Sequence, residues 1–328
     1  MKVLVTGGSG YVGSSTVREL AAAGHDVLIY DNLSTGHRKL SDGFQLVEGD
    51  IADREKLHSC LRNKDAVLHF AASAYVGESV ENPRKYFRNN VESGLLLMDA
   101  VLASDVRLFV FSSSCAVYGA PHVLPIAETS PKEPINPYGA TKLFFEQILS
   151  AYGVSHGLRY AALRYFNAAG AHPCGKIGEI HTPETHLVPL AIKAALGTAP
   201  PLTVFGDKLD TRDGTCIRDF IHVSDLAFAH VKALEYLAVG GPSVALNLGT
   251  GKGTSIAEVL HAVKKAANRT VPHRIGPPRP GDPPVLLADA RKAKEVLGWE
   301  ARFLLEDIVQ SALQWEEQLP GFLAGSSR

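Results

Sequence analysis

Short apolar runs alternate with longer amphipathic stretches through the first half of the chain. Five of the runs have the length and composition of β-strands, at residues 3–5, 27–30, 44–47, 66–70 and 108–111. Segments between them, such as residues 14–23 and 89–102, have the apolar spacing of helices. This alternation predicts an α/β fold in which a doubly wound parallel sheet carries helices on both faces.

The pattern changes after about Asn167. The stretches NAAGAHPCGKIGE and PRPGDPPVL are rich in Gly and Pro and indicate loops, although strand-like runs recur at residues 220–223 and 244–248. We therefore expect a smaller α/β domain that is interleaved with the first one. The first domain is expected at residues 1–168, with residues 218–249 returning to it, and the second domain at residues 169–328.

The composition narrows the classes of partner. A chain of 328 residues with 45% hydrophobic content can bury a large core, and its formal net charge of -1 favours neither a nucleic-acid nor a membrane partner. The apolar run near Met1 is too short for a signal peptide or a membrane span, so we expect a cytoplasmic protein. The four cysteines include no Cys-x-x-Cys pair, which favours unpaired thiols in a reducing compartment, and we expect no metal site.

A glycine-rich loop follows the first predicted strand. The stretch TGGSGYVG at residues 6–13 satisfies G-x-G-x-x-G through Gly8, Gly10 and Gly13, and G-x-x-G-x-x-G through Gly7, Gly10 and Gly13. Glycines permit a tight turn and a close approach of the backbone to a pyrophosphate, which the N–H groups of the following helix then bind. In this context the loop predicts a dinucleotide site in a Rossmann-type sheet.

An acidic residue supports this prediction. Asp31 ends the second predicted strand about twenty residues after the loop, where a carboxylate can accept both hydroxyls of an adenosine ribose. Asp31 would repel a 2′-phosphate, and the next residues, Asn32 and Leu33, offer no cation to bind one. NAD is therefore favoured over NADP.

A tyrosine and a lysine lie four residues apart in PINPYGATKLFFEQIL. Tyr138-x-x-x-Lys142 is a weak signal by itself, because chance alone readily produces it in a chain of this length. Asn136 and Pro137 have the residue types of a helix N-cap and first helical position, which would place Tyr138 in the first turn. Lys142 would then lie on the same helical face.

These motifs occur together with the serine run FSSSCAVYG, in the order and spacing of a known family. The chain resembles the extended short-chain dehydrogenase/reductase family, and within it the UDP-glucose (UDP-galactose) 4-epimerases. The likeness also covers HFAASAYVGESV, LRYFNAAGAHPCG, DGTCIRDFIHVSDLA, NLGTGKGTS and RPGDPP. It implies an NAD-dependent 4-epimerase of UDP-sugars, most simply UDP-glucose and UDP-galactose, that acts through a transient 4-keto intermediate.

The resemblance also implies residue roles. Tyr138 would be the acid/base, Lys142 its partner, and Ser114 the residue that hydrogen-bonds the sugar hydroxyl. The NAD site would consist of Tyr138 and Lys142 together with Gly7, Gly10, Tyr11, Val12, Gly13, Asp31, Asn32, Asp50, Ile51, Phe70, Ala71, Ala72, Asn90, Ser112 and Tyr165. The UDP-sugar site would consist of Ser114 and Tyr138 with Asn167, His186, Leu187, Thr203, Phe205, Arg218, Arg279, Asp282 and Leu286.

The implied reaction requires a base whose pKa is near neutral, whereas the pKa of free tyrosine is ~10. The ammonium of Lys142 and the positive nicotinamide ring would favour the phenolate, and a lowering by about three pKa units corresponds to ~4 kcal/mol. Arg218 and Arg279 would each clamp phosphate oxygens, and Asp282 would accept ribose hydroxyls. Pairing of Arg218 with Asp213 or Asp219 is the structural alternative.

Several alternatives remain open. Leu286 lies where the family gates the sugar pocket, and its intermediate size also admits UDP-N-acetylglucosamine or UDP-xylose/UDP-arabinose. A 4,6-dehydratase usually has an Asp-Glu pair where this chain has Cys115-Ala116, and a non-catalytic NAD-binding protein would not need Tyr138, Lys142 and Ser114. Many of these epimerases have Lys at the position of Ala74. The resemblance further implies a homodimer, with the apolar set Leu143, Phe144 and Ile148 packing against protein.

Overall fold

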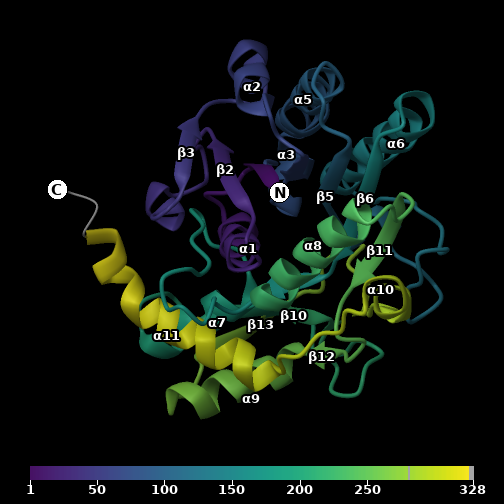
Figure 1. The fold of residues 1–328 in the computed structure, drawn as a ribbon. Coiled ribbons are helices and arrows are strands. Elements are labelled where there is room, and N and C mark those ends of the chain that lie inside the picture. Colours follow the sequence, from purple (N-terminus) through teal and green to yellow (C-terminus); the bar gives the residue numbers. More distant parts are fainter. Residues whose placement is uncertain (280, 325–328) are drawn as a thin grey trace.

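The computed structural model describes residues 1–279 and 281–324 and contains a central sheet of seven parallel strands (Figure 1). Every neighbouring pair in this sheet is parallel. In order across the sheet, the strands are β11 (Val244–Leu248), β6 (Arg159–Tyr165), β5 (Leu108–Ser114), β4 (Ala66–His69), β1 (Lys2–Thr6), β2 (Asp26–Asp31) and β3 (Gln45–Glu48).

Two helical layers cover the sheet. On one face, α1 (Tyr11–Ala22), α8 (Val223–Ala238) and α10 (Arg291–Leu297) bury apolar side chains against the strands. On the other face, α2 (Arg54–Leu61), α5 (Ser93–Leu102) and α6 (Pro137–His156) do the same. The predicted α/β fold with a doubly wound parallel sheet is confirmed.

The five strands predicted in the first half of the chain are present, but the sequence analysis missed β6. This strand lies between β5 and β11, and its central residues are buried. Its sequence RYAALRY contains two arginines, which obscure the continuous apolar run typical of a strand buried on both faces. Arg164 is buried in spite of its charge, because Glu146 of α6 pairs with it.

A second core lies at the other end of the molecule. It packs α7 (Leu187–Leu196), α9 (Ile256–Ala267) and α11 (Leu305–Ala324) around apolar side chains, and Figure 1 shows α9 and α11 on the opposite side from α2 and α5. Short sheets join this part: β7 (Asn167–Ala169) with β10 (Phe220–His222), β8 (Leu202–Phe205) with β13 (His273–Gly276), and β9 (Ile217–Arg218) with β12 (Thr254–Ser255) and β14 (Val285–Leu286).

Shorter helical segments connect these elements. They are η1 (Arg38–Ser41), α3 (Val76–Glu81), α4 (Pro83–Tyr86), the π-helix η2 (Phe87–Glu92) and η3 (Cys115–Tyr118). The predicted helix at residues 89–102 is therefore a π-helical turn followed by α5. All four cysteines are free, and none of the described helices is long and apolar enough to span a membrane.

Helix α6 begins as its sequence predicts. The Asn136 side chain caps the helix by accepting a hydrogen bond from Gly139 N at 2.8 Å, and Pro137 is the first helical residue. The helix ends at Gly157, whose φ of 68° is left-handed and favours glycine. The cap places Tyr138 in the first turn, as expected.

Candidate active site

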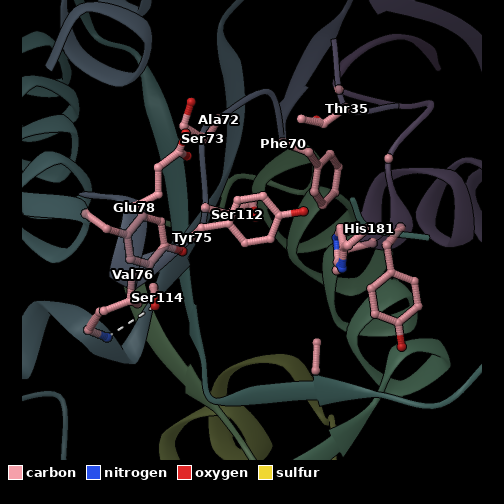
Figure 2. Close-up of a pocket in the computed structure, with 18 of the residues that line it drawn as sticks. Thr35, Phe70, Ala72, Ser73, Tyr75, Val76, Glu78, Ser112, Ser114 and His181 are labelled. Atoms are coloured by element: carbon pink, nitrogen blue, oxygen red, sulfur yellow. Dashed lines mark hydrogen bonds between the residues drawn. The ribbon is translucent and has the colours of Figure 1, made fainter. Parts of the chain in front are cut away.

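A cavity of about 800 Å³ opens at the carboxyl ends of the central strands. Across the sheet the order β3-β2-β1-β4-β5-β6 reverses direction between β1 and β4, and ligands of such sheets bind outside that point. The glycine loop after β1, the end of β5 and the start of α6 all line the cavity. Figure 2 shows Phe70, Ser112, Ser114 and His181 among the side chains around it.

The glycine loop has no space for side chains at two positions. Gly7 has a φ of +73°, and a Cβ added there would lie 2.4 Å from Ala71 N. A Cβ at Gly13 would lie 2.2 Å from Gly7 O. Helix α1 then begins at Tyr11 and has no side-chain cap, so no capping side chain occupies the N–H groups of its first turn. The first residues of this turn line the cavity. This backbone fits a pyrophosphate.

Asp31 is buried at the end of β2, where it lines the same cavity. Its carboxylate accepts hydrogen bonds from Ser9 N at 2.9 Å and Leu33 N at 2.8 Å, which fix its orientation. Burial raises the pKa of Asp31, and these two hydrogen bonds oppose that rise. The fixed carboxylate keeps free lone pairs, as an acceptor of ribose hydroxyls requires.

Tyr138 and Lys142 lie on one face of α6, both buried. The Lys142 ammonium donates to Ser112 O at 2.8 Å, and its Nζ is 5.8 Å from the centre of the Tyr138 ring. Burial raises the pKa of Tyr138, and the nearby Ser114 hydroxyl opposes this rise. Burial also lowers the pKa of Lys142 to about 7. The chain alone therefore does not produce the lowered phenol pKa that the sequence analysis expected.

A buried ion pair supports this face of α6, and the sequence analysis missed it. Glu146 follows Lys142 by one helical turn and accepts two hydrogen bonds at 2.5 Å, one from Ser113 Oγ and one from Arg164 Nη2. Arg164 also donates to the Tyr118 hydroxyl at 2.8 Å. Tyr138, Lys142 and Glu146 thus form a row at four-residue spacing, and that spacing was visible in the sequence.

Most of the predicted site residues lie on the wall of the one cavity. They are Gly7, Gly10, Tyr11, Val12, Gly13, Asp31, Asn32, Ile51, Phe70, Ala71, Ala72, Ser112, Ser114, Tyr138, Tyr165, Asn167, His186, Arg218, Arg279, Asp282 and Leu286. Within the described part of the chain, six predicted residues are not on this wall: Asp50, Asn90, Lys142, Leu187, Thr203 and Phe205.

Contacts explain where the residues off the wall lie. Asn90 is buried, and its amide donates to Ser73 O and to Thr141 Oγ1, both at 3.0 Å. Asp50 Oδ2 accepts a hydrogen bond from Asn32 Nδ2 at 2.7 Å. Asn90 thus holds the wall residue Ser73, and the exposed Asp50 holds the wall residue Asn32.

Lys142 lies in α6, and the other three predicted residues lie in the second core or at its edge. Leu187 begins α7 and packs against that core. Thr203 accepts a hydrogen bond from Arg274 Nε at 3.1 Å, and the Phe205 ring lies 4.1 Å below the Arg279 guanidinium. Phe205 therefore contacts Arg279, which itself lies on the cavity wall.

Comparison with known proteins identifies the family. A model described as the NAD dependent epimerase/dehydratase family matches residues 3–249. The chain belongs to this family. It is 52% identical to the UDP-glucose 4-epimerase of Rhizobium meliloti over 320 residues, which cover 96% of this chain and 97% of that protein.

Solved structures of other epimerases agree with this result. The UDP-glucose 4-epimerase from Brucella ovis in complex with NAD has a TM-score of 0.94 and 50% identity, with 98% of each chain covered. The UDP-glucose 4-epimerase from Stenotrophomonas maltophila, with bound NAD and formylated UDP-arabinopyranose, has a TM-score of 0.95 and 41% identity, covering 98% of this chain and 99% of that one.

Arg218 of this epimerase/dehydratase-family chain has a partner that the sequence analysis did not expect. Its Nη2 donates to Asp282 Oδ1 at 2.6 Å, whereas Asp213 and Asp219 bond to other groups. The register of β9 with β14 pairs Arg218 with Leu286, and this brings residues distant in sequence together. The expected phosphate clamp and ribose acceptor therefore bind each other across the cavity wall.

The sequence analysis also missed a cluster of titratable residues beside the cavity. Glu179, His181 and His186 line it, and Glu184 completes the cluster. The spacing Glu-x-His-x-x-Glu-x-His was visible in the sequence, but only cysteine spacing was examined for metal ligands.

Proposed function

We propose that this epimerase/dehydratase-family chain is an NAD-dependent 4-epimerase of UDP-sugars, with UDP-glucose and UDP-galactose as its main pair. One observation carries the proposal: Tyr138 and Ser114 line the same cavity as the glycine loop and Asp31. A proton-transferring phenol thus lies within one site with a dinucleotide-binding loop. The likeness to the UDP-glucose 4-epimerase of Rhizobium meliloti supports the same reaction.

Gly7, Gly10 and Gly13 would hold the pyrophosphate of NAD, and Asp31 its adenosine ribose. When bound, NAD supplies a hydride acceptor and a positively charged ring. The Tyr138 hydroxyl would take the proton of the sugar C4 hydroxyl as the C4 hydrogen leaves, and return it when the hydrogen comes back to the other face. Such general acid–base transfer contributes about 10²–10⁴-fold to the rate.

The neighbours of Tyr138 would position this transfer. Ser114 would hold the C4 oxygen, because it lines the same cavity wall as the Tyr138 phenol. Lys142, held by Ser112 O at 2.8 Å, would stabilise the phenolate by its charge. Burial lowers the pKa of Lys142 to about 7. The carboxylate of Glu146 opposes this effect and favours the ammonium form of Lys142.

Arg218 and Arg279 would bind the diphosphate, and Asp282 the uridine ribose. Arg218 would exchange its ion pair with Asp282, at 2.6 Å, for phosphate oxygens when the substrate binds. If the UDP group supplies most of the binding free energy, the keto-sugar can rotate in the cavity and present its other face. Leu286, on the same cavity wall as Arg218 and Asp282, would limit the size of the sugar.

We also propose the organisation of the whole protein. Residues 1–168 with residues 218–249 would hold NAD, and the rest of residues 169–328 would hold the UDP-sugar. A cytoplasmic homodimer would form through α5 and α6, where Leu95 and Phe144 are 37% and 43% exposed. Size-exclusion chromatography with light scattering tests the dimer.

The test is chromatography of the equilibrium mixture after incubation with a panel of UDP-sugars. The panel includes UDP-glucose, UDP-N-acetylglucosamine and UDP-xylose, each with NAD. The proposal expects UDP-galactose from UDP-glucose. A product without the C6 hydroxyl would indicate a dehydratase, and NAD binding without turnover of any UDP-sugar would indicate a non-catalytic protein.

A UDP-N-acetylhexosamine or UDP-pentose is the second candidate substrate class. Leu286 favours the N-acetyl sugars, since leucine is smaller than the aromatic residues that exclude N-acetyl groups, and the stretch HFAASAYVGES resembles enzymes of the pentoses. Relative turnover within the same panel decides between the classes.

A further inference from the structure

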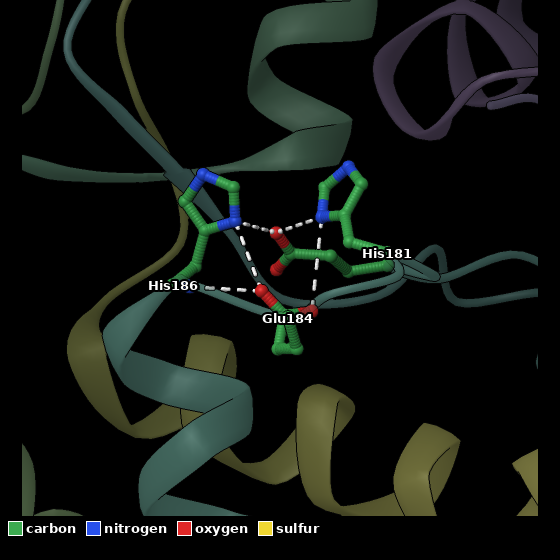
Figure 3. Close-up of side chains that lie close together, drawn as sticks. His181, Glu184 and His186 are labelled. Atoms are coloured by element: carbon green, nitrogen blue, oxygen red, sulfur yellow. Dashed lines mark hydrogen bonds and ion pairs between the residues drawn. The ribbon is translucent and has the colours of Figure 1, made fainter. Parts of the chain in front are cut away.

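A compact group of four metal-ligand side chains lies on the loop between β7 and α7. Glu179, His181, Glu184 and His186 each offer one ligand atom, and these atoms all lie within 4.8 Å of one another. Figure 3 shows the His181 and His186 rings with the carboxylate of Glu184 between and below them. The proposed epimerase reaction uses none of them as an acid or base.

The distances among these atoms suit a single ion. Nδ1 of His186 is 2.7 Å from Glu179 Oε1. Nδ1 of His181 is 3.0 Å from Glu179 Oε1 and 3.7 Å from Glu184 Oε2. A tetrahedral ion with ligand distances of about 2.0–2.1 Å separates its ligand atoms by about 3.3 Å, which lies within this range.

Among the described residues, two of the ligand atoms lie at ion-pair distance from other members of the cluster but make no hydrogen bond of good geometry. They are His181 Nδ1 and Glu184 Oε2, and both are buried. The other oxygen of Glu184 accepts hydrogen bonds from Thr185 N at 2.7 Å and His186 N at 2.8 Å. The backbone thus orients this carboxylate so that its second oxygen faces His181 at 3.7 Å. Buried polar atoms that lack a well-formed hydrogen bond are uncommon, and a bound ion would satisfy both of them.

The surrounding structure holds the ligands in place. The loop is anchored to α11, because Trp315 Nε1 donates to Glu179 O at 2.9 Å. A Cβ at Gly178 would lie 2.3 Å from the Trp315 ring, so the backbone and the indole are in close contact. Ile177 and Ile180 are buried in the same small core. A site on such a rigid loop loses little conformational entropy when it binds an ion.

We propose that these four side chains bind one divalent transition-metal ion. Two imidazoles and two carboxylates are a ligand set that Zn²⁺ accepts in tetrahedral geometry, and the two carboxylates balance its charge. Tyr11 of the glycine-loop region and Tyr75 place their ring edges against His181, with ring centres 6.4 and 5.6 Å away. The ion would therefore fix the loop of the second core against the cofactor side of the cavity.

The same side chains can instead act as histidine–carboxylate ion pairs without a metal. Metal content separates the two possibilities. The protein is dialysed against EDTA, reloaded with Zn²⁺, desalted and analysed for metal, and its affinity is measured by competition with a chromophoric chelator. Loading with Co²⁺ gives an independent readout, since a tetrahedral site has strong visible absorption.

The key variant is His181→Gln with Glu184→Gln. Its matched control is His172→Gln with Glu19→Gln, which removes a histidine–carboxylate pair at 3.1 Å that includes no further carboxylate among the described residues. We expect one Zn²⁺ per chain in the wild type and the control, and at least a ~100-fold weaker affinity in the variant. If the double variant does not fold, the single variant His186→Gln is used in its place, because His186 is the most exposed of the four side chains.

The proposal is overturned if reloaded wild type retains no Zn²⁺, or if the cluster variant binds as much as the control. It does not depend on the proposed epimerase activity, because metal content is measured without any substrate. An inactive protein that still binds one Zn²⁺ would therefore refute the function and leave the metal site standing.

Discussion

Replacing Glu146 by Gln would break the buried ion pair behind Tyr138 and Lys142. The side chains of Arg164 and Glu146 are 4% and 8% exposed, and their closest oxygen and nitrogen atoms are 2.5 Å apart. Glutamine preserves the volume but leaves the guanidinium without a counter-charge. Removal of one member of such a pair costs about 3–5 kcal/mol. At about 2 °C per kcal/mol for a large chain, Tm should fall by about 6–10 °C.

The assay is urea unfolding of Glu146→Gln, Arg164→Met and the double variant. Because each single change leaves the other group unpaired, the double variant should be more stable than the sum of the single effects predicts, by about 2 kcal/mol. Additive single effects, or a loss below about 1 kcal/mol for Glu146→Gln, would refute the reasoning. Loss of Glu146 should also lower the pKa of Lys142 further, since its carboxylate opposes the effect of burial.

Three further predictions concern the cofactor, the sugar and pH. Because Asp31 repels a 2′-phosphate, NADP should support little turnover, and equal initial rates with NAD and NADP would contradict this. Leu286→Tyr should lower turnover of UDP-N-acetyl sugars relative to UDP-glucose, and an unchanged ratio would count against a role in sugar size. Burial lowers the pKa of His69 to about 3 and of His222 and His230 to about 4. These histidines stay neutral in the folded chain but take up protons when the chain unfolds. The free energy of unfolding should therefore be highest above pH ~6.5 and fall toward pH 5, by up to about 1.4 kcal/mol per pH unit for each histidine. The test is urea unfolding at pH 7, 6 and 5. His230→Leu should reduce the change of the free energy of unfolding with pH, whereas the control His58→Gln, at an exposed position, should leave that change as in the wild type. An equal pH dependence in His230→Leu and the wild type would contradict the prediction.

The sequence predicts the fold and the cofactor side of the site well, because the relevant signals are local. The strands that were predicted contain short apolar runs, and the glycine loop, Asp31 and the capped start of α6 each depend on neighbouring residues. Strand β6 escaped prediction because Arg164 becomes compatible with burial only through Glu146 on another element. Which residues face each other across elements is set by packing.

The substrate side was harder to predict for the same reason. The pair Arg218 and Asp282 depends on the register between β9 and β14, which no local pattern specifies. Thr203 matched a family position, yet its hydroxyl bonds to Arg274 away from the cavity wall. The Glu179–His186 cluster is different, since its spacing is local. Only the fold of the loop shows that its four ligand atoms converge.

The most direct test of the account compares Tyr138→Phe with Tyr160→Phe. Each variant loses one phenol hydroxyl, but Tyr160 lies on β6 and is not among the residues found on the cavity wall within the described chain. Tyr138→Phe should bind NAD and UDP-glucose normally and lose turnover to UDP-galactose by about 10²–10⁴-fold. Tyr160→Phe should remain as active as the wild type. Wild-type turnover in Tyr138→Phe would contradict the central claim.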